Sequence, residues 1–133
     1  MDLQAVSMNV FRVPFFRFLN FDIQEVGEFH AKAEMAFDSR HIGNPVMEHY
    51  HGGIIASFME ATAAIAVQPD FAEVPVKPIN LTVDYLRPGM KGPLTAHATV
   101  TRKGSRIASV RVLSWQASPE KSVAEGLYHF LLV

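Results

Sequence analysis

The spacing of hydrophobic residues in the first third of the chain predicts a short arm, then two strands, then a loop. Residues 3–19 contain four phenylalanines and are interrupted by Pro14, which favours a short helix or an irregular arm. Residues 20–38 predict two strands with a turn near Gly27, because apolar residues occupy every second position of the second strand. The turn-rich residues 39–50 predict a loop.

A nearly unbroken run of apolar and small residues over 52–67 predicts a helix that is buried on almost every side. The helix is expected to end before Pro69, because proline fits poorly inside a helix, and Pro75 and Pro78 mark the connection that follows. Glu60 lies in the middle of this run. A charge in such a stretch is costly to desolvate, so it is expected to have a partner or a chemical role.

The last third of the chain alternates apolar and polar residues with a period of two, which predicts strands. Short turns, at Pro88 and Gly89 and around Gly104, separate these strands and favour antiparallel pairing. The expected strands cover residues 79–85, 94–101, 106–116 and 122–132. With the apolar helix they predict an α+β fold in which a long antiparallel sheet wraps one helix. No repeat or linker divides the chain, so residues 1–133 are expected to form one domain.

Composition narrows the class of protein. The 133 residues are 49% hydrophobic and 19% charged, which is typical of a globular domain, and a formal net charge of −1 argues against a general nucleic-acid binder. The chain has no cysteine, which excludes disulfides, thiolate metal sites and cysteine nucleophiles. There is no signal-peptide pattern and no run of about 18 apolar residues that could span a membrane. A cytoplasmic protein is therefore expected.

The start of the apolar helix carries the candidate chemistry. Gly52 and Gly53 follow His51, and glycines let a ligand approach the backbone closely. The first N–H groups of a helix have no partner inside it and can hold a developing negative charge. With the Glu60 carboxylate in the same helix, this is the outline of an acyl-transfer site. The alternative is a structural Glu60 satisfied by the backbone or by Thr62.

Two other clusters have ordinary interpretations. His41, His49 and His51 are close in sequence, but their spacing does not match a zinc motif, and no metal is expected. His30, His97 and His129 are expected at the surface or an interface, and Arg87 is expected to pair with Asp84 or with an acid of a partner chain. A basic turn is typical of a solvated hairpin; its residues are Arg102, Lys103, Gly104, Ser105 and Arg106.

Taken together, these features resemble the hot-dog-fold thioesterases, in particular the phenylacetate-pathway and 4-hydroxybenzoyl-CoA thioesterases. The resemblance extends from about Gly43 to the C-terminus. It rests on Asn44, His51-Gly52-Gly53, Glu60, the strand from Asn80 to Pro88, the basic turn and the final Ala124-Glu125-Gly126. The resemblance implies a hot-dog fold. It also implies an enzyme that hydrolyses an acyl-CoA to the free acid and coenzyme A without a cofactor.

The resemblance also implies a role for each site residue. The Gly52 N–H would be the main oxyanion donor, and Gly53 would help the chain turn. Glu60 would activate water or attack the carbonyl directly, while Asn44 would orient the water or the carboxylate. His51 would orient the loop or contact the thioester sulfur. The site would lie across a dimer interface, with Glu60 acting on a substrate held by the partner's Gly52, and such dimers commonly pair into tetramers.

The basic turn gains a second interpretation from the resemblance, which places the nucleotide end of coenzyme A near it. Two positions depart from the family pattern. Glu60 stands where most phenylacetate-branch relatives have aspartate. The family amide six residues before the histidine is here Pro45, so Asn44, His49 or Glu48 would take its place.

Two other functions fit the same residues. One is a hydratase or dehydratase acting on acyl-CoA or acyl-carrier-protein substrates, and the other is a non-enzymatic acyl-CoA-binding protein. The phenylalanine-rich arm over 1–19 has three interpretations: packing over the domain or a subunit contact, a lid over an acyl pocket, or a membrane-surface helix. With Phe58 and Met59 it would suit a medium-length or aromatic acyl group, but the sequence does not identify that group.

Overall fold

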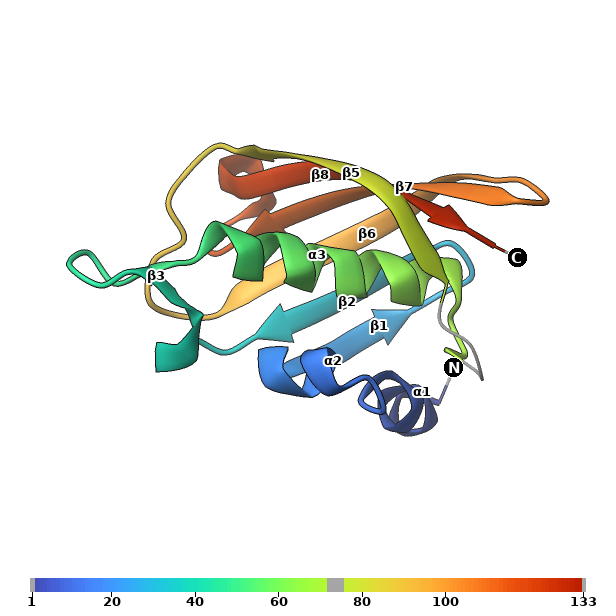
Figure 1. Cartoon of the computed structure of the whole chain (residues 1–133), viewed down its shortest axis with the longest axis horizontal. Helices are drawn as coiled ribbons and strands as arrows, with labels where there is room; N and C mark the ends of the chain where they lie inside the picture. The colour runs from blue at the N-terminus through green and yellow to red at the C-terminus, as the bar shows by residue number, and fades with distance from the viewer. Residues whose placement is uncertain (1, 72–75, 133) are drawn as a thin grey trace.

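Helix α3 (Gly52–Val67) forms the centre of the molecule, and an antiparallel sheet curves around it (Figure 1). The computed structural model describes residues 2–71 and 76–132. The strand order is β1-β2-β6-β7-β8-β5, so β1 and β5 are the two edges of this sheet. Its strands are β1 (Phe21–Val26), β2 (His30–Met35), β5 (Lys77–Tyr85), β6 (Leu94–Lys103), β7 (Ile107–Trp115) and β8 (Ser122–Leu131). The predicted α+β architecture is confirmed.

Complementary side-chain sizes let the helix lie close to the sheet. The face of the sheet that is turned to α3 carries mainly small residues, including Ala33, Ala96 and Val112, all buried. Bulky side chains of α3, such as Phe58 and Met59, fill the space above them and are inaccessible to solvent. Burying each side chain of this size contributes about 1.5–3 kcal/mol, so the apolar run that predicted the helix also stabilises its position.

The N-terminal arm consists of two short helices rather than one interrupted helix. Helix α1 (Leu3–Val10) begins at Asp2, whose carboxylate accepts the N–H groups of Gln4 and Ala5 at 3.0 and 3.3 Å. Helix α2 (Pro14–Leu19) has Pro14 in its first turn, where the missing N–H has no cost. Both helices lie near β1, at the edge of the sheet away from β5 (Figure 1).

Two predicted loops contain more structure than their sequence indicates. Residues 39–50 hold a short 3-10 turn (Ser39–His41) and a small hairpin of β3 (Ile42–Asn44) and β4 (His49–Tyr50). Pro78 was expected in the connection after α3 but lies within β5, where the register is irregular between Pro78 and Asn80. Proline is tolerated on edge strands and at bulges, and Pro78 lies on an edge strand beside a register irregularity. Pro75 lies outside the described residues.

The two edges of the sheet differ in regularity and in side chains. Strand β1 has a bulge between Ile23 and Glu25, and its Asp22 and Glu25 side chains are exposed. Strand β5 instead exposes apolar side chains, since Ile79 is 50% and Leu81 42% accessible.

In the described part of the chain, no helix has the length and hydropathy that a membrane-spanning segment needs.

Candidate active site

The first turn of α3 leaves one backbone donor free. The imidazole Nδ1 of His51 accepts the Gly53 N–H at 2.8 Å, so the ring of a neutral His51 carries its proton on Nε2. The His51 carbonyl accepts the N–H groups of Ile54 and Ile55 at 3.0 and 3.1 Å. Among the described residues, the Gly52 N–H has no acceptor. The predicted oxyanion donor is therefore the unused donor at this helix N-terminus.

The β3–β4 hairpin determines how the chain enters α3. The Asn44 Oδ1 accepts the N–H groups of Val46 and Met47, each at 3.1 Å, and this closes the turn of the hairpin. A Cβ at Gly43 would lie 2.5 Å from the His51 Cα, so only glycine allows β3 to pass this close. The carboxamide oxygen of Asn44 thus has a structural role in the loop, and its predicted role in orienting water stays a prediction.

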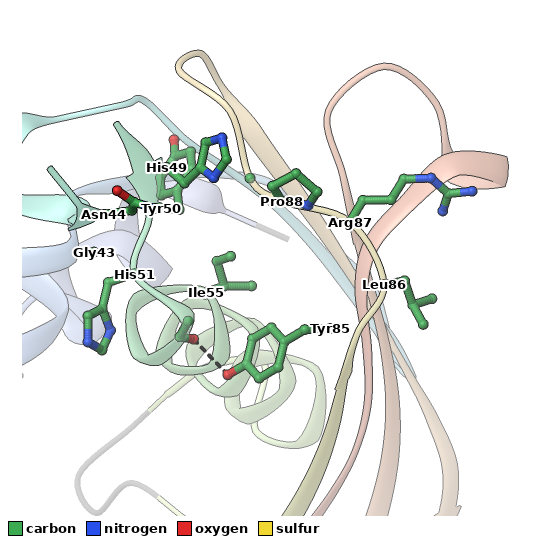
Figure 2. Close-up of a pocket in the computed structure, with 12 residues that line it drawn as sticks. Gly43, Asn44, His49, Tyr50, His51, Ile55, Tyr85, Leu86, Arg87 and Pro88 are labelled. Carbon is green, nitrogen blue, oxygen red and sulfur yellow. Dashed lines mark hydrogen bonds between the residues drawn. The ribbon is translucent and has the colours of Figure 1, made fainter. Parts of the chain in front are cut away.

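A cleft of about 480 Å³ separates this loop from the end of β5. The hydroxyl of Tyr85 donates to the Gly52 carbonyl at 2.8 Å across one side of the cleft, the dashed line in Figure 2. The Tyr85 ring would lie 3.2 Å from a Cβ on residue 52, so a side chain there would displace the ring. Figure 2 also shows the His51 ring pointing away from Tyr85 and Ile55. Tyr85 was not predicted as a site residue, although it lies in the strand from Asn80 to Pro88 on which the resemblance rests.

Glu60 lies eight residues beyond Gly52 on α3 and has no hydrogen-bond or ion-pair partner within residues 2–71 and 76–132. Its side chain is half-buried, and this burial raises the pKa of its carboxyl group. Thr62, the structural partner considered for it, instead donates its hydroxyl to the Phe58 carbonyl at 2.9 Å. Within the described residues, neither Thr62 nor a backbone group is therefore the partner considered for Glu60. At 1.5 Å per residue, Glu60 and Gly52 of one chain are about 12 Å apart along the helix axis.

The basic turn between β6 and β7 surrounds a hollow of about 320 Å³. Arg102, Gly104, Ser105 and Arg106 all line it. Lys103 does not, because its ammonium group donates to the Val67 carbonyl at 2.9 Å and so binds the C-terminal end of α3. Figure 1 shows this turn and the β3–β4 hairpin at opposite ends of the molecule, so a single chain keeps the two predicted substrate-binding regions apart.

The structure also places the clustered histidines and Arg87. The His51 N–H donates to the His41 carbonyl at 2.7 Å, but the His41 side chain is fully buried, whereas His49 and His51 line the cleft. Among the described residues, no group of three histidine, aspartate or glutamate side chains is arranged to hold a metal ion. Arg87 does not pair with Asp84 within the described chain but donates to the Ser122 carbonyl at 2.9 Å.

Glu48, one possible replacement for the family amide, forms an ion pair with Lys91. His129 contacts Asn80 at 2.7 Å on the outer face of the sheet. Two of the residues that could replace the family amide, Asn44 and Glu48, therefore contact neighbouring parts of their own chain.

Comparisons with known sequences give a consistent result. The thioesterase superfamily model matches residues 47–123. The medium/long-chain acyl-CoA thioesterase YigI of Salmonella typhimurium is 30% identical over 122 residues, covering 80% of this chain and 77% of the relative. The protein of the same name from Escherichia coli is 28% identical, with the same coverage of both chains.

Solved structures share the whole architecture. A protein from the thioesterase superfamily solved by X-ray diffraction superimposes with a TM-score of 0.86 at 29% identity, covering 98% of both chains. A putative thioesterase of Ralstonia eutropha, described as phenylacetic acid degradation-related, gives a TM-score of 0.80 at 20% identity and covers 90% of both chains. At that lower identity the likeness supports the fold alone.

Proposed function

This chain belongs to the thioesterase superfamily, and on that premise we propose that it hydrolyses acyl-CoA thioesters to the free acid and coenzyme A. The observation that carries the proposal is the free N–H of Gly52 at the start of α3, because Gly52 borders the cleft that Tyr85 also lines. Medium- and long-chain acyl groups are the first to test, because the curated relatives are named for them.

In the proposed reaction, the thioester carbonyl oxygen accepts the Gly52 N–H. Glu60 takes a proton from water while the water oxygen bonds to the carbonyl carbon, and the resulting oxyanion is held by the same N–H and the helix N-terminus. Collapse of this intermediate breaks the C–S bond, and the thiolate leaves and is protonated. In the second route, the Glu60 carboxylate attacks the carbonyl carbon and the C–S bond breaks, so that the thiolate leaves and is protonated. Water then hydrolyses the resulting anhydride to the free acid and restores the Glu60 carboxylate.

The distance between Gly52 and Glu60 supports a site shared by two chains. One residue cannot act on a carbonyl held about 12 Å away, so the Glu60 of one subunit is proposed to serve the partner's Gly52. The exposed apolar side chains of β5 support this assembly, because an edge strand with free backbone groups and apolar side chains can pair with a second copy. A homodimer is proposed on this basis, with pairing into a tetramer as a further possibility.

The basic turn fits the same arrangement. It lies beside the C-terminal end of α3, about 22 Å from Gly52 of its own chain. In a dimer with a shared site, Arg102 and Arg106 would bind the phosphates of a substrate whose carbonyl lies at the partner's Gly52. Guanidinium groups suit phosphate oxygens because their donors are charged and planar. A cytoplasmic location stays a prediction.

Subunit complementation tests the chemistry and the shared site together. Glu60→Gln removes the carboxylate, and Gly52→Pro removes the N–H at a helix position that proline tolerates. Gly52→Ala is the control for the proline variant, because it adds a Cβ beside the Tyr85 ring but keeps the N–H. Glu60→Gln and Gly52→Pro alone should each lose at least about a hundredfold in kcat, measured as free thiol released from octanoyl-CoA. When the two are unfolded together and refolded in equal amounts, random pairing gives mixed dimers in which one of two sites is intact, so about a quarter of the parental activity should return.

The outcomes separate the parts of the proposal. No recovery in the refolded mixture, with dimers present by light scattering, would place Gly52 and Glu60 in one site of one chain. Full activity of Glu60→Gln alone would remove Glu60 from the mechanism. A parental protein that binds acyl-CoA without releasing thiol would contradict the hydrolase assignment.

A further inference from the structure

A second cleft, of about 380 Å³, opens on the other side of His51. It lies between the N-terminal arm, the start of the β3–β4 hairpin and the first two turns of α3. His51 borders both clefts, and Gly53 and Ser57 line this one from α3. The free Gly52 N–H, between His51 and Gly53 in the chain, thus lies where the two clefts approach each other.

The second cleft has mainly apolar walls. Phe15 comes from α2, Ile42 from β3 and Ile54 from α3. His51 and Ser57 add polar atoms to the lining, and Arg40 adds a charge. That charge is already satisfied, because the Arg40 side chain donates to both oxygens of Asp38 at 3.1 and 3.2 Å. The first cleft is different, since it includes Asn44, His49 and Arg87.

The ring of Phe15 is held at the cleft without belonging to the core. Helix α2 buries Phe16 and Leu19 and turns Phe15 and Phe18 outward, where their rings stack at 5.9 Å and 13°. The Arg40 guanidinium lies 5.2 Å from the Phe18 ring on the same side. Phe15 remains 47% exposed, so the fold leaves an aromatic surface open beside the active-site helix.

A thioester extends in two directions from its carbonyl carbon, one apolar and one carrying the amides of the coenzyme. We propose that the acyl chain enters the second cleft and that Phe15 determines the preference for acyl-chain length. The amide-bearing arm of coenzyme A then occupies the more polar first cleft. This assignment rests on the proposed function. Phe15 is a specificity-determining residue, because its ring meets the chain several bonds from the reacting carbonyl.

Chain-length profiles test the assignment with two matched variants. Phe15→Ala removes the ring from the cleft, while Phe29→Ala removes an equally exposed ring (49%) in the β1–β2 turn at the other end of the sheet. The measurement is kcat/KM for thiol release across saturated acyl-CoAs from butyryl to palmitoyl. Burying about two methylene groups against an aromatic ring corresponds to roughly tenfold in kcat/KM.

Phe15→Ala should therefore lose about tenfold on chains long enough to reach the ring and stay within about twofold of the parent on butyryl-CoA. Retained butyryl-CoA activity also shows that the variant is folded. Phe29→Ala should follow the parental profile at every length. A Phe15→Ala profile parallel to that of the parent, or the same change in Phe29→Ala, would overturn the assignment. If the parent hydrolyses no acyl-CoA at all, the proposed function fails, and this inference fails with it.

Discussion

Replacing Lys103 with methionine separates helix stabilisation from substrate binding. The Lys103 ammonium lies 2.9 Å from the Val67 carbonyl at the C-terminal end of α3, where a positive charge is favoured by the helix dipole. Hydrogen bonds from charged groups contribute about 1.5–3 kcal/mol, and solvent around this exposed lysine reduces that to about 1 kcal/mol. For a domain of this size, a loss of about 1 kcal/mol lowers Tm by about 3–5 °C.

The assay compares Lys103→Met with Arg102→Met, a change of the neighbouring residue that lines the basic hollow. Thermal unfolding at one fixed protein concentration should show the lower Tm only for Lys103→Met. The KM for acyl-CoA should rise only for Arg102→Met, by about tenfold if a charge-assisted contact to phosphate is lost. A Lys103→Met protein with the parental Tm and a raised KM would refute this reasoning and return Lys103 to the substrate-binding set.

Three further predictions follow from described contacts. Burial raises the Glu60 pKa, so the folded state gains stability from the bound proton below pH about 4.5 and loses it as pH rises through the raised value. Glu60→Gln should therefore unfold at a higher Tm than the parent near pH 8, and the gap should close toward pH 4. His51→Ala removes the cap of α3 and should lower stability by about 1 kcal/mol in denaturant titrations, whereas His51→Asn, which can cap, should restore most of it. Leu81→Asp places a charge on the β5 edge and should give an inactive species of 14.8 kDa by light scattering; an active dimer would contradict pairing through β5.

The elements with strong periodicity were predicted well from the sequence. The boundaries of α3 agree with the apolar run from Gly52 to Val67, and the alternating segments became β5 to β8. Local pattern is sufficient in these cases because one buried face selects one periodicity. The β3–β4 hairpin was missed, because strands this short have no measurable period and depend on contacts such as the two that close the Asn44 turn.

Within the candidate site, the sequence was a good guide to the candidate site residues. It was a poorer guide to the groups that those residues contact. His51, Gly52 and Gly53 are together at the helix start, as expected from their adjacency. Lys103 could not be placed, because its acceptor on Val67 lies 36 residues earlier in the chain. No local signal reports such a contact. Whether Glu60 and Gly52 act on the same substrate is harder still to predict from the sequence, since about 12 Å of helix separates them in one chain.

The unequal edges of the sheet have a consequence for how far assembly can proceed. A strand that pairs with its own copy around a twofold axis uses up that edge in both chains, so only the β1 edges remain at the ends of the joined sheet. Each β1 edge is interrupted by the bulge between Ile23 and Glu25 and carries exposed carboxylates, which would repel an approaching strand. In the proposed dimer, growth by strand addition would therefore stop at two chains. The unequal edges would then allow one specific pairing while resisting open-ended fibres at high protein concentration.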